Sequence, residues 1–103
     1  MSNLPNMTPE NADEMLATTK TLVLDFGATC CGPCKRIGPI VEKFAADHAD
    51  KVDAGYVDVG AHPALAQRFG VMGVPTVIIF KAGKEEKRFG ANLNLQMLEA
   101  VLS

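Results

Sequence analysis

Two cysteines separated by a Gly-Pro pair are the feature of this sequence that most directly suggests chemistry. Cys31 and Cys34 enclose Gly32 and Pro33, and residues three apart lie on one face of a helix. Their Cα atoms would then be roughly 5 to 5.5 Å apart, within the range that a disulfide tolerates. Pro33 suits the first turn of a helix, where the N–H that proline lacks has no partner in any case. The spacing therefore predicts a redox-active pair that opens and closes a Cys31–Cys34 disulfide at the start of a helix.

Cys31 is the predicted nucleophile of this pair. At a helix N-terminus its sulfur would meet unpaired N–H groups and the positive end of the helix dipole, which favour thiolate over thiol. A zinc site is the alternative, because zinc proteins use the same spacing. A closed structural zinc site usually takes four ligands, and the remaining candidates are Cys30, His48 and His62. We expect both histidines to lie at helix ends far from the cysteines, so we predict no metal site.

The composition places the chain among ordinary globular proteins. Its 103 residues suffice for a single domain, 1–103, and 48% of them are hydrophobic against 21% charged. A net charge of −2 gives no electrostatic argument for binding nucleic acid or an anionic membrane. The N-terminus lacks the basic and apolar regions of a signal peptide, and no apolar run approaches the length of a membrane span. Three cysteines within five positions do not form a secreted disulfide framework, so we expect a cytoplasmic protein.

Alternating strand and helix patterns surround the cysteines. A buried apolar strand is expected over 21–26, directly before them, and a helix from 34 to about 48 directly after them. Thr8 and Pro9 are expected to open a helix that reaches about residue 18, and Asn94 is expected to cap the last helix. The other expected elements are an edge strand over 4–7, strands over 52–59, 76–80 and 85–89, and a short helix over 63–69. This order predicts an α/β fold with a central mixed β-sheet and helices on both faces.

Motifs on both sides of the cysteines resemble those of the thioredoxin family over essentially the whole chain. The residues that carry the resemblance are Leu22-Val23-Leu24-Asp25-Phe26, Cys31-Gly32-Pro33-Cys34-Lys35, Gly73-Val74-Pro75-Thr76 and Val77-Ile78-Ile79-Phe80-Lys81-Ala82-Gly83. The resemblance implies the thioredoxin fold and a protein dithiol-disulfide oxidoreductase that reduces disulfides of partner proteins. It also implies a thioredoxin-reductase-type electron donor and no bound cofactor. We expect the protein to be a monomer.

Thiol exchange through a mixed disulfide gives each residue of the motif a task. Cys31 as thiolate would attack a disulfide of the partner, and Cys34 would then attack Cys31 and release the reduced partner. Cys34 must lose its proton although burial raises the pKa of a thiol, so a base is needed. Asp25 is the candidate, since desolvation raises the pKa of a carboxyl group in an apolar strand, and the matching aspartate of thioredoxins is held to accept this proton. The alternative is a buried polar residue that is simply hydrogen-bonded to the backbone.

The resemblance assigns substrate binding to the loop before the strand over 76–80. It implies that the Val74–Pro75 peptide bond is cis and lies against the redox pair, and that Gly73 and Gly90 also contact the substrate. The backbone of Val74 would then pair with an extended segment of the partner, which gives affinity without much sequence selectivity. Alternatively, Pro75 only begins the next strand, a position where proline is tolerated.

Three positions depart from the thioredoxin pattern. Cys30 stands where the family ordinarily has tryptophan, Gly27 stands where it usually has another aromatic residue, and the chain contains no tryptophan. We expect weaker or different docking of partners, because apolar area is lost beside the cysteines, and a looser strand end at Gly27. Tyr56 stands where a lysine is common near the buried aspartate. Without that cation Asp25 should be harder to ionise, which predicts a slower resolving step at low pH.

Cys30 has three interpretations. It is a small apolar filler, a regulatory thiol whose oxidation, glutathionylation or bonding to a partner would switch off Cys31, or a ligand that binds a metal or an iron–sulfur cluster together with Cys31 or Cys34. Gly32-Pro33 favours a reductant, because family members with this dipeptide are reducing, whereas oxidases and isomerases usually carry histidine there. An oxidant or isomerase of the same fold and a non-enzymatic metal-binding or redox-sensing module are the alternatives.

Overall fold

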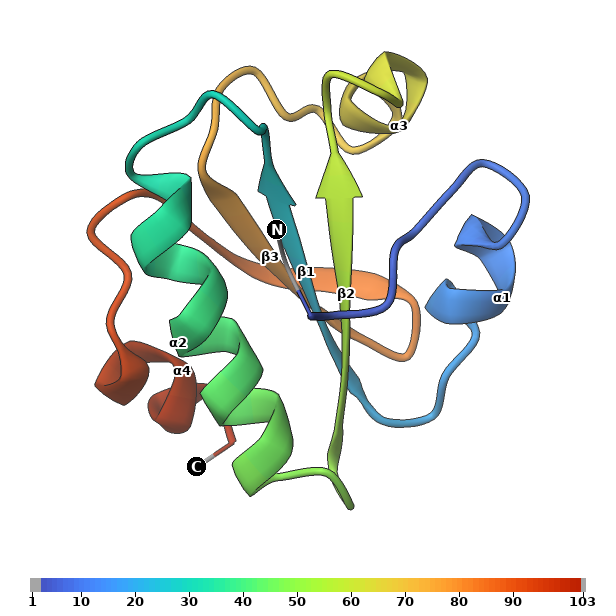
Figure 1. Cartoon of the computed structure of the whole chain (residues 1–103). Helices are drawn as coiled ribbons and strands as arrows, with labels where there is room; N and C mark the ends of the chain where they lie inside the picture. Colours follow the sequence, from blue (N-terminus) through green and yellow to red (C-terminus); the bar gives the residue numbers. More distant parts are fainter. Residues whose placement is uncertain (1–2, 103) are drawn as a thin grey trace.

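A computed structural model describes residues 3–102 and shows a mixed β-sheet between two layers of helices (Figure 1). The strands are β1 (Thr21–Gly27), β2 (Val52–Asp58), β3 (Thr76–Lys81) and β4 (Lys84–Phe89). They lie in the order β2-β1-β3-β4, with β1 and β2 parallel and the pairs β1–β3 and β3–β4 antiparallel. The predicted α/β fold with a central mixed sheet is therefore confirmed.

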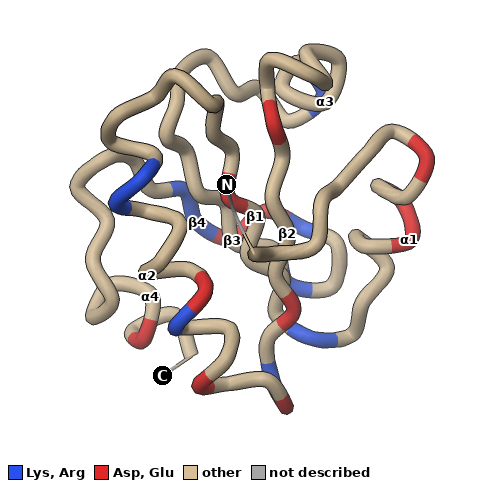
Figure 2. The backbone as a smooth tube through the Cα atoms, viewed as in Figure 1, with Lys and Arg blue, Asp and Glu red and all other residues tan. Residues whose placement is uncertain are grey.

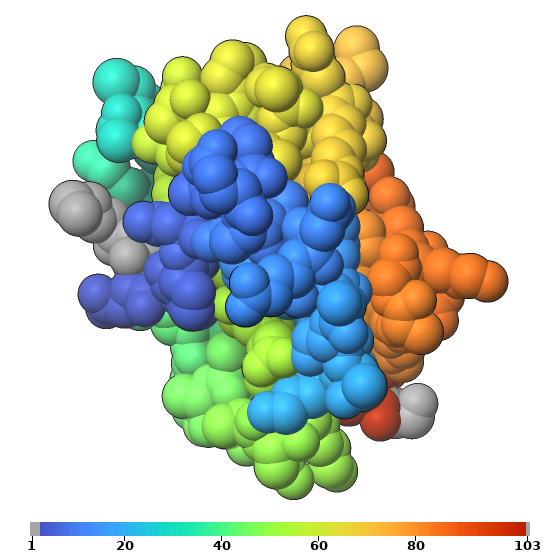
Figure 3. Space-filling model, turned by 90° about the vertical axis from the view of Figure 1, so that its right-hand side faces the viewer, coloured from blue at the N-terminus to red at the C-terminus, as the bar shows by residue number. Residues whose placement is uncertain are grey.

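Alternate residues of the central strand β1 face two separate apolar layers. The helices are α1 (Ala12–Leu16), α2 (Cys34–Asp47), α3 (Pro63–Arg68) and α4 (Leu95–Val101). Val23 packs with side chains of α2 and α4, whereas Leu22, Leu24 and Phe26 pack with those of α1 and α3. Figure 3 shows the blue N-terminal residues and the yellow residues of α3 next to each other over this second face. Because successive side chains of a strand point to opposite faces, Asp25 shares the α2 face with Val23.

The N-terminal segment joins the sheet at one point. The edge strand predicted over 4–7 is wrong, because this segment forms an isolated bridge between Asn6 and Tyr56 instead. The backbone N–H of Met7 donates to the carbonyl of Tyr56 (2.8 Å), and the N–H of Tyr56 donates to the carbonyl of Pro5 (2.8 Å). Proline has no N–H with which to extend such a ladder, so the pairing stays local.

The first helix is shorter than predicted. It begins at Ala12 rather than near Pro9, and it ends at Leu16. The N–H of Thr8 donates to Asn11 Oδ1 (2.7 Å), and the N–H of Asn11 donates to Thr8 Oγ1 (3.3 Å). These reciprocal bonds close the segment as a turn and compete with helical hydrogen bonds.

The remaining elements were predicted to within one residue at the ends that were specified. Asn94 caps α4 as predicted, since the N–H of Met97 donates to Asn94 Oδ1 (2.9 Å). Figure 2 shows acidic and basic residues interspersed along the chain, with a basic segment at the first turn of α2. None of the helices between residues 3 and 102 has the length and apolar character that a bilayer crossing requires.

Candidate active site

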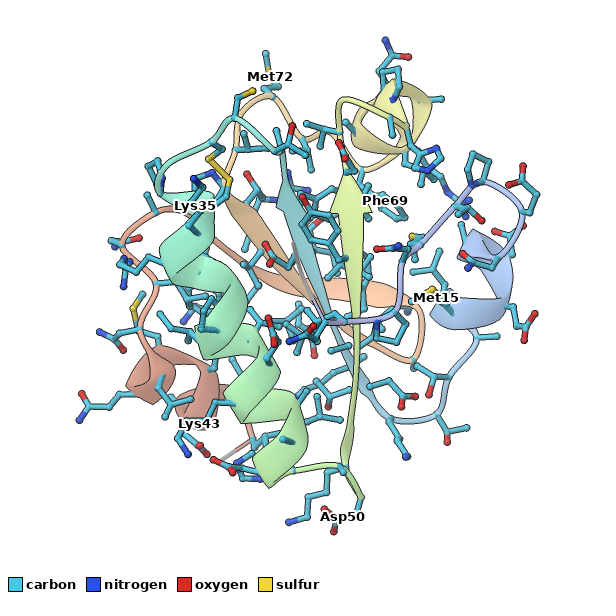
Figure 4. The ribbon with its side chains drawn as sticks, viewed as in Figure 1. Met15, Lys35, Lys43, Asp50, Phe69 and Met72 are labelled. Carbon is cyan, nitrogen blue, oxygen red and sulfur yellow. A yellow bond between two sulfur atoms is a disulfide. The ribbon has the colours of Figure 1, made fainter. Side chains whose placement is uncertain are left out.

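Cys31 and Cys34 form a disulfide at the start of α2, drawn as the yellow bond beside Lys35 in Figure 4. Their Cα atoms are 5.3 Å apart, as the spacing predicts. Both cysteines are half-buried, and the sulfur atoms lie where the first N–H groups of α2 have no partner within the helix. One of these groups, the N–H of Cys34, donates to Cys31 Sγ at 3.2 Å. A thiolate on Cys31 would accept the same hydrogen bond, which favours its ionised form.

Asp25 lies in the middle of β1, and only 2% of its surface is exposed. Burial raises the pKa of its carboxyl group from 3.8 to about 7, and the nearby charge of Glu42 acts in the same direction. Its Oδ1 atom is buried and makes no hydrogen bond within the described part of the chain. A carboxylate that is merely satisfied by backbone hydrogen bonds does not fit this environment. The group can instead take up a proton near neutral pH.

Asp25 and Cys34 line the same pocket, which has a volume of about 660 Å³. The other titratable side chains of its lining come from α2, β2 and the segment before α3, and they are Lys35, Glu42, Tyr56, Asp58 and His62. The second cysteine and the buried carboxyl group therefore border one pocket, through which a proton could pass between them.

Gly27 and Tyr56 fit together beside Cys34. A Cβ atom at Gly27 would lie 3.1 Å from Cε1 and 3.2 Å from Oη of Tyr56, and 3.4 Å from Sγ of Cys34. Because Gly27 has no side chain, the space between the Tyr56 ring and Cys34 stays open. The expected loosening at Gly27 is wrong: this residue is buried, pairs with Asp58 in the β1–β2 ladder, and accepts a hydrogen bond from the N–H of Val59 (3.0 Å). The parallel ladder holds its backbone in spite of the freedom of glycine.

A second carboxyl group, that of Glu42, approaches Asp25 across a bare glycine. A Cβ atom at Gly38 would lie 3.7 Å from Glu42 Oε2 and 4.0 Å from Asp25 Oδ2. The other oxygen of Glu42 accepts a hydrogen bond from Asn3 Nδ2 (3.0 Å). Glu42 was not predicted from the sequence. The sequence feature that could have indicated it is the spacing of four residues between Gly38 and Glu42, which puts both on one side of α2.

The loop expected to bind substrate lies at the end of the sheet that leads to the cysteines. The Val74–Pro75 peptide bond is cis. Phe26 pairs with Thr76, so the residues before Thr76 lie beside the end of β1. Gly73 is exposed, Val74 is half-buried and Pro75 is buried.

Gly90 and Met72 belong to the same end of the molecule. Val77 pairs with Phe89, which brings the end of β4, and Gly90 after it, next to the start of β3. Met72 is 99% exposed, and its side chain points away from the protein (Figure 4). The sheet topology thus gathers the sequence-predicted residues of the loop and of Gly90 at one edge.

Cys30 is exposed and is not part of a disulfide. Its sulfur lies 4.0 Å from the hydroxyl group of Thr29. The interpretation of Cys30 as an apolar filler does not fit this exposure, because a filler would be packed against other side chains.

The two histidines lie in different places. His48 is at the C-terminal end of α2, where its Nε2 atom is 2.7 Å from Glu99 Oε1. His62, expected to be far from the cysteines, lines the pocket that Cys34 also lines. The turn after β2 brings it there, since two N–H groups of the turn donate to Asp58 Oδ1 (2.9 and 3.2 Å). Between residues 3 and 102, no three His, Cys, Asp or Glu side chains are grouped in a way that could hold a metal ion.

A disulfide at a helix start, with a buried carboxyl group of raised pKa in the adjoining pocket, is the arrangement of a dithiol-disulfide oxidoreductase. Comparison with known proteins agrees with this class. The family model described as Thioredoxin matches residues 3–103. Thioredoxin from Alicyclobacillus acidocaldarius subsp. acidocaldarius is 36% identical over 97 residues, which are 94% of this chain and 92% of that protein.

Two further relatives support the same assignment. Thioredoxin from Staphylococcus haemolyticus (strain JCSC1435) is 45% identical over 78 residues, which are 76% of this chain and 74% of that protein. The solved structure of a mutant thioredoxin from Halobacterium salinarum NRC-1 is similar with a TM-score of 0.86 at 28% identity, covering 95% of this chain and 85% of that chain. The chain belongs to the thioredoxin family. The predicted family, fold and disulfide oxidoreductase activity are confirmed.

Proposed function

We propose that the protein reduces disulfides of partner proteins by thiol exchange at Cys31. The Cys31 thiolate attacks one sulfur of the partner's disulfide; a bond from Cys31 to the partner forms as the partner's own S–S bond breaks. Cys34 then attacks Cys31 Sγ, the Cys31–Cys34 bond forms, and the partner leaves as a dithiol. Two electrons pass from the cysteine pair to the partner. The observation that carries this proposal is the closed Cys31–Cys34 pair at the N-terminus of α2, with the N–H of Cys34 on Cys31 Sγ at 3.2 Å.

Asp25 accepts the proton that Cys34 loses before its attack. The raised pKa of about 7 supports this assignment, because Asp25 is mostly a carboxylate above pH 7 and mostly protonated below it. The resolving step is therefore expected to be fast above pH 7 and to slow as the pH falls through 7.

The partner chain binds in extended form along the loop that contains Gly73, Val74 and Pro75, with Gly90 at its side. The position of this loop beside the end of β1 supports the assignment. Hydrogen bonds from the backbone of Val74 would hold the partner with little dependence on its sequence. A protein that binds in this way can act on many different disulfides.

The direction of the reaction is reduction of the partner, for which Gly32 and Pro33 between the cysteines are suited. Proteins of the thioredoxin family act on disulfide-containing targets and are themselves reduced by thioredoxin reductase. We infer a donor of this type, no bound cofactor, and a cytoplasmic monomer. Cys30, exposed and adjacent to the nucleophile, is assigned as a regulatory thiol whose oxidation or glutathionylation blocks Cys31.

A measurement of the reduction potential tests the direction. The protein is equilibrated in graded thiol-disulfide buffers, free thiols are trapped, and mass spectrometry gives the number of oxidised thiols. We expect two oxidised thiols and a potential close to the value of about −270 mV that is typical of thioredoxins. A potential above about −200 mV would identify an oxidant or isomerase instead. Stoichiometric metal in the purified protein would identify a metal-binding module.

Reduction of insulin disulfides, with dithiothreitol as the electron donor, tests the residues. Cys31→Ser and Cys34→Ser should each remove the catalysed rate. Cys30→Ser is the matched control, because it removes an exposed thiol next to the pair and should leave the rate of the untreated enzyme unchanged. The test of Cys30 replaces dithiothreitol, which would itself reduce a mixed disulfide at Cys30, with NADPH and a thioredoxin reductase. After treatment with oxidised glutathione and removal of the excess, the wild-type rate should fall and the rate of Cys30→Ser should not; equal losses in both would refute the regulatory assignment.

A further inference from the structure

Tyr56 has a phenol group next to the second cysteine, and the proposed function gives it no task. The point where a Gly27 side chain would begin lies 3.2 Å from Tyr56 Oη and 3.4 Å from Cys34 Sγ. The hydroxyl group and the sulfur therefore border the same small space at the end of β1. An aromatic side chain at Gly27, in contrast, would separate them.

The ring of Tyr56 is held in this place by its backbone. Tyr56 pairs with Asp25 in the parallel ladder of β1 and β2. On its other side, its N–H donates to the carbonyl of Pro5 and its carbonyl accepts from the N–H of Met7, both at 2.8 Å. The tyrosine is thus fixed between two backbone segments, so its side chain approaches Cys34 from a defined direction.

The neighbours of the phenol leave its donor uncommitted. Asp25 on β1, Asp58 on β2, Glu42 and Lys35 on α2, and His62 before α3 line the pocket with Tyr56. Between residues 3 and 102, the Tyr56 hydroxyl makes no hydrogen bond, in contrast to Asp58, whose Oδ1 atom accepts two backbone N–H groups. A neutral O–H donor next to a sulfur that must become a thiolate is chemically suited to stabilise it.

We propose that Tyr56 is a positioning residue for Cys34: its hydroxyl group donates a hydrogen bond to the Cys34 sulfur when the disulfide is open. The hydrogen bond holds the thiolate in place while its proton rests on Asp25. In the resolving step Cys34 Sγ attacks Cys31 Sγ, the bond between Cys31 and the partner breaks, and the partner sulfur leaves as thiolate. The hydrogen bond is lost as Cys34 becomes part of the neutral disulfide. This inference rests on the proposed resolving role of Cys34.

Tyr56→Phe tests the inference, because phenylalanine keeps the ring beside Gly27 and removes only the hydroxyl group. Reduced protein is mixed with a limiting amount of 5,5′-dithiobis(2-nitrobenzoate) in a stopped-flow instrument. Attack by Cys31 releases a first thionitrobenzoate, and attack by Cys34 on the mixed disulfide releases the second. All proteins carry Cys30→Ser, because an exposed third thiol would also react. We expect an unchanged first phase and a second phase about tenfold slower at pH 7, which corresponds to about 1.4 kcal/mol.

A second measurement uses the wild-type protein and needs no variant at position 56. The chain contains one tyrosine and no tryptophan, so phenolate absorbance reports Tyr56 alone. A phenol that donates to a thiolate holds its proton more firmly, so we expect Tyr56 to ionise at higher pH in the reduced protein than in the oxidised one. In Cys34→Ala, Tyr56 should ionise at the same pH as in the oxidised wild type, with or without a reductant. The sulfur that would accept the hydrogen bond is missing from this variant.

The outcomes separate this inference from the proposed function. If wild-type protein releases no second thionitrobenzoate, the resolving role of Cys34 fails, and the inference fails with it. If wild type shows both phases, and Tyr56→Phe resolves within twofold of wild type, only the inference is overturned. A phenol titration that is independent of the redox state would also overturn it. A slower second phase together with a redox-dependent titration would establish the hydrogen bond.

Discussion

The charge of Asp25 is expected to destabilise the folded protein above pH 7, and Asp25→Asn should remove this cost. The pKa of the carboxyl group is 3.8 without the protein environment and about 7 in the fold, mainly because of burial. Between pH 4 and 7 the unfolded chain therefore releases a proton that the folded protein keeps. The free energy of unfolding falls through this window and is level above it. Since each pH unit between the two values corresponds to about 1.4 kcal/mol, the total is about 4 kcal/mol.

Urea unfolding of the oxidised proteins at pH 4 and pH 8.5 measures this effect. At pH 4 the buried groups of wild type and Asp25→Asn are both neutral, so their stabilities should be similar. At pH 8.5 the variant should be more stable by several kcal/mol, with about 4 kcal/mol as the upper value. Asp50→Asn is the control: Asp50 is exposed (labelled in Figure 4), and its replacement should change stability by less than about 0.5 kcal/mol at either pH. An equal effect of Asp25→Asn at both pH values would contradict the linkage.

Three further outcomes are expected. The rate constant of the resolving step should rise through a midpoint near pH 7, and Asp25→Asn should lose that midpoint in stopped-flow measurements; identical pH profiles would exclude Asp25 as the proton acceptor. Gly27→Ala should lower the free energy of unfolding in urea by about 1 to 3 kcal/mol, because its Cβ would lie 3.1 Å from the Tyr56 ring. Gly73→Ala, with nothing within 4 Å, is its control and should stay within about 0.5 kcal/mol. Phe44→Ala should cost about 3 to 5 kcal/mol in the same assay, because its side chain is fully buried in the layer of α2 and α4; a loss below about 1 kcal/mol would show that this layer closes around the cavity.

Elements that bury an apolar face could be predicted closely from the sequence. The run before the cysteines is apolar on both faces, and β1 occupies it from Thr21 with one residue more than expected. The first helix could not be placed in this way. Thr8 and Asn11 are both suited to the N-cap position. Asn11 occupies it without a side-chain hydrogen bond to the helix, because the mutual hydrogen bonds of Thr8 and Asn11 close the turn between them.

In the site, too, residues marked by local properties of the sequence could be predicted, whereas contacts between elements could not. Cys31, Cys34 and Asp25 stand out because a spacing of three and a carboxyl group in an apolar strand are local properties of the sequence. The approach of Glu42 to Asp25 and the fit of Tyr56 beside Gly27 are contacts between elements. They depend on how α2 lies across the sheet and on the parallel register of β1 and β2, neither of which follows from the spacing within one element.

Gly27 and Tyr56 are best understood as one change from the thioredoxin pattern rather than two. The absence of a side chain at Gly27 gives the ring of Tyr56 its space beside Cys34. Burial, then Asp58 and Asp25, raise the pKa of the phenol above 10, so Tyr56 is uncharged at neutral pH. A lysine at this position would hold a positive charge close to Asp25 and lower the pKa of its carboxyl group. With tyrosine there, no positive charge among residues 3–102 offsets the burial of Asp25 and the charge of Glu42, and the pKa of Asp25 stays at about 7. On the proposed role of Asp25 as proton acceptor, the packing around Gly27 would therefore also set the pH at which the resolving step can proceed.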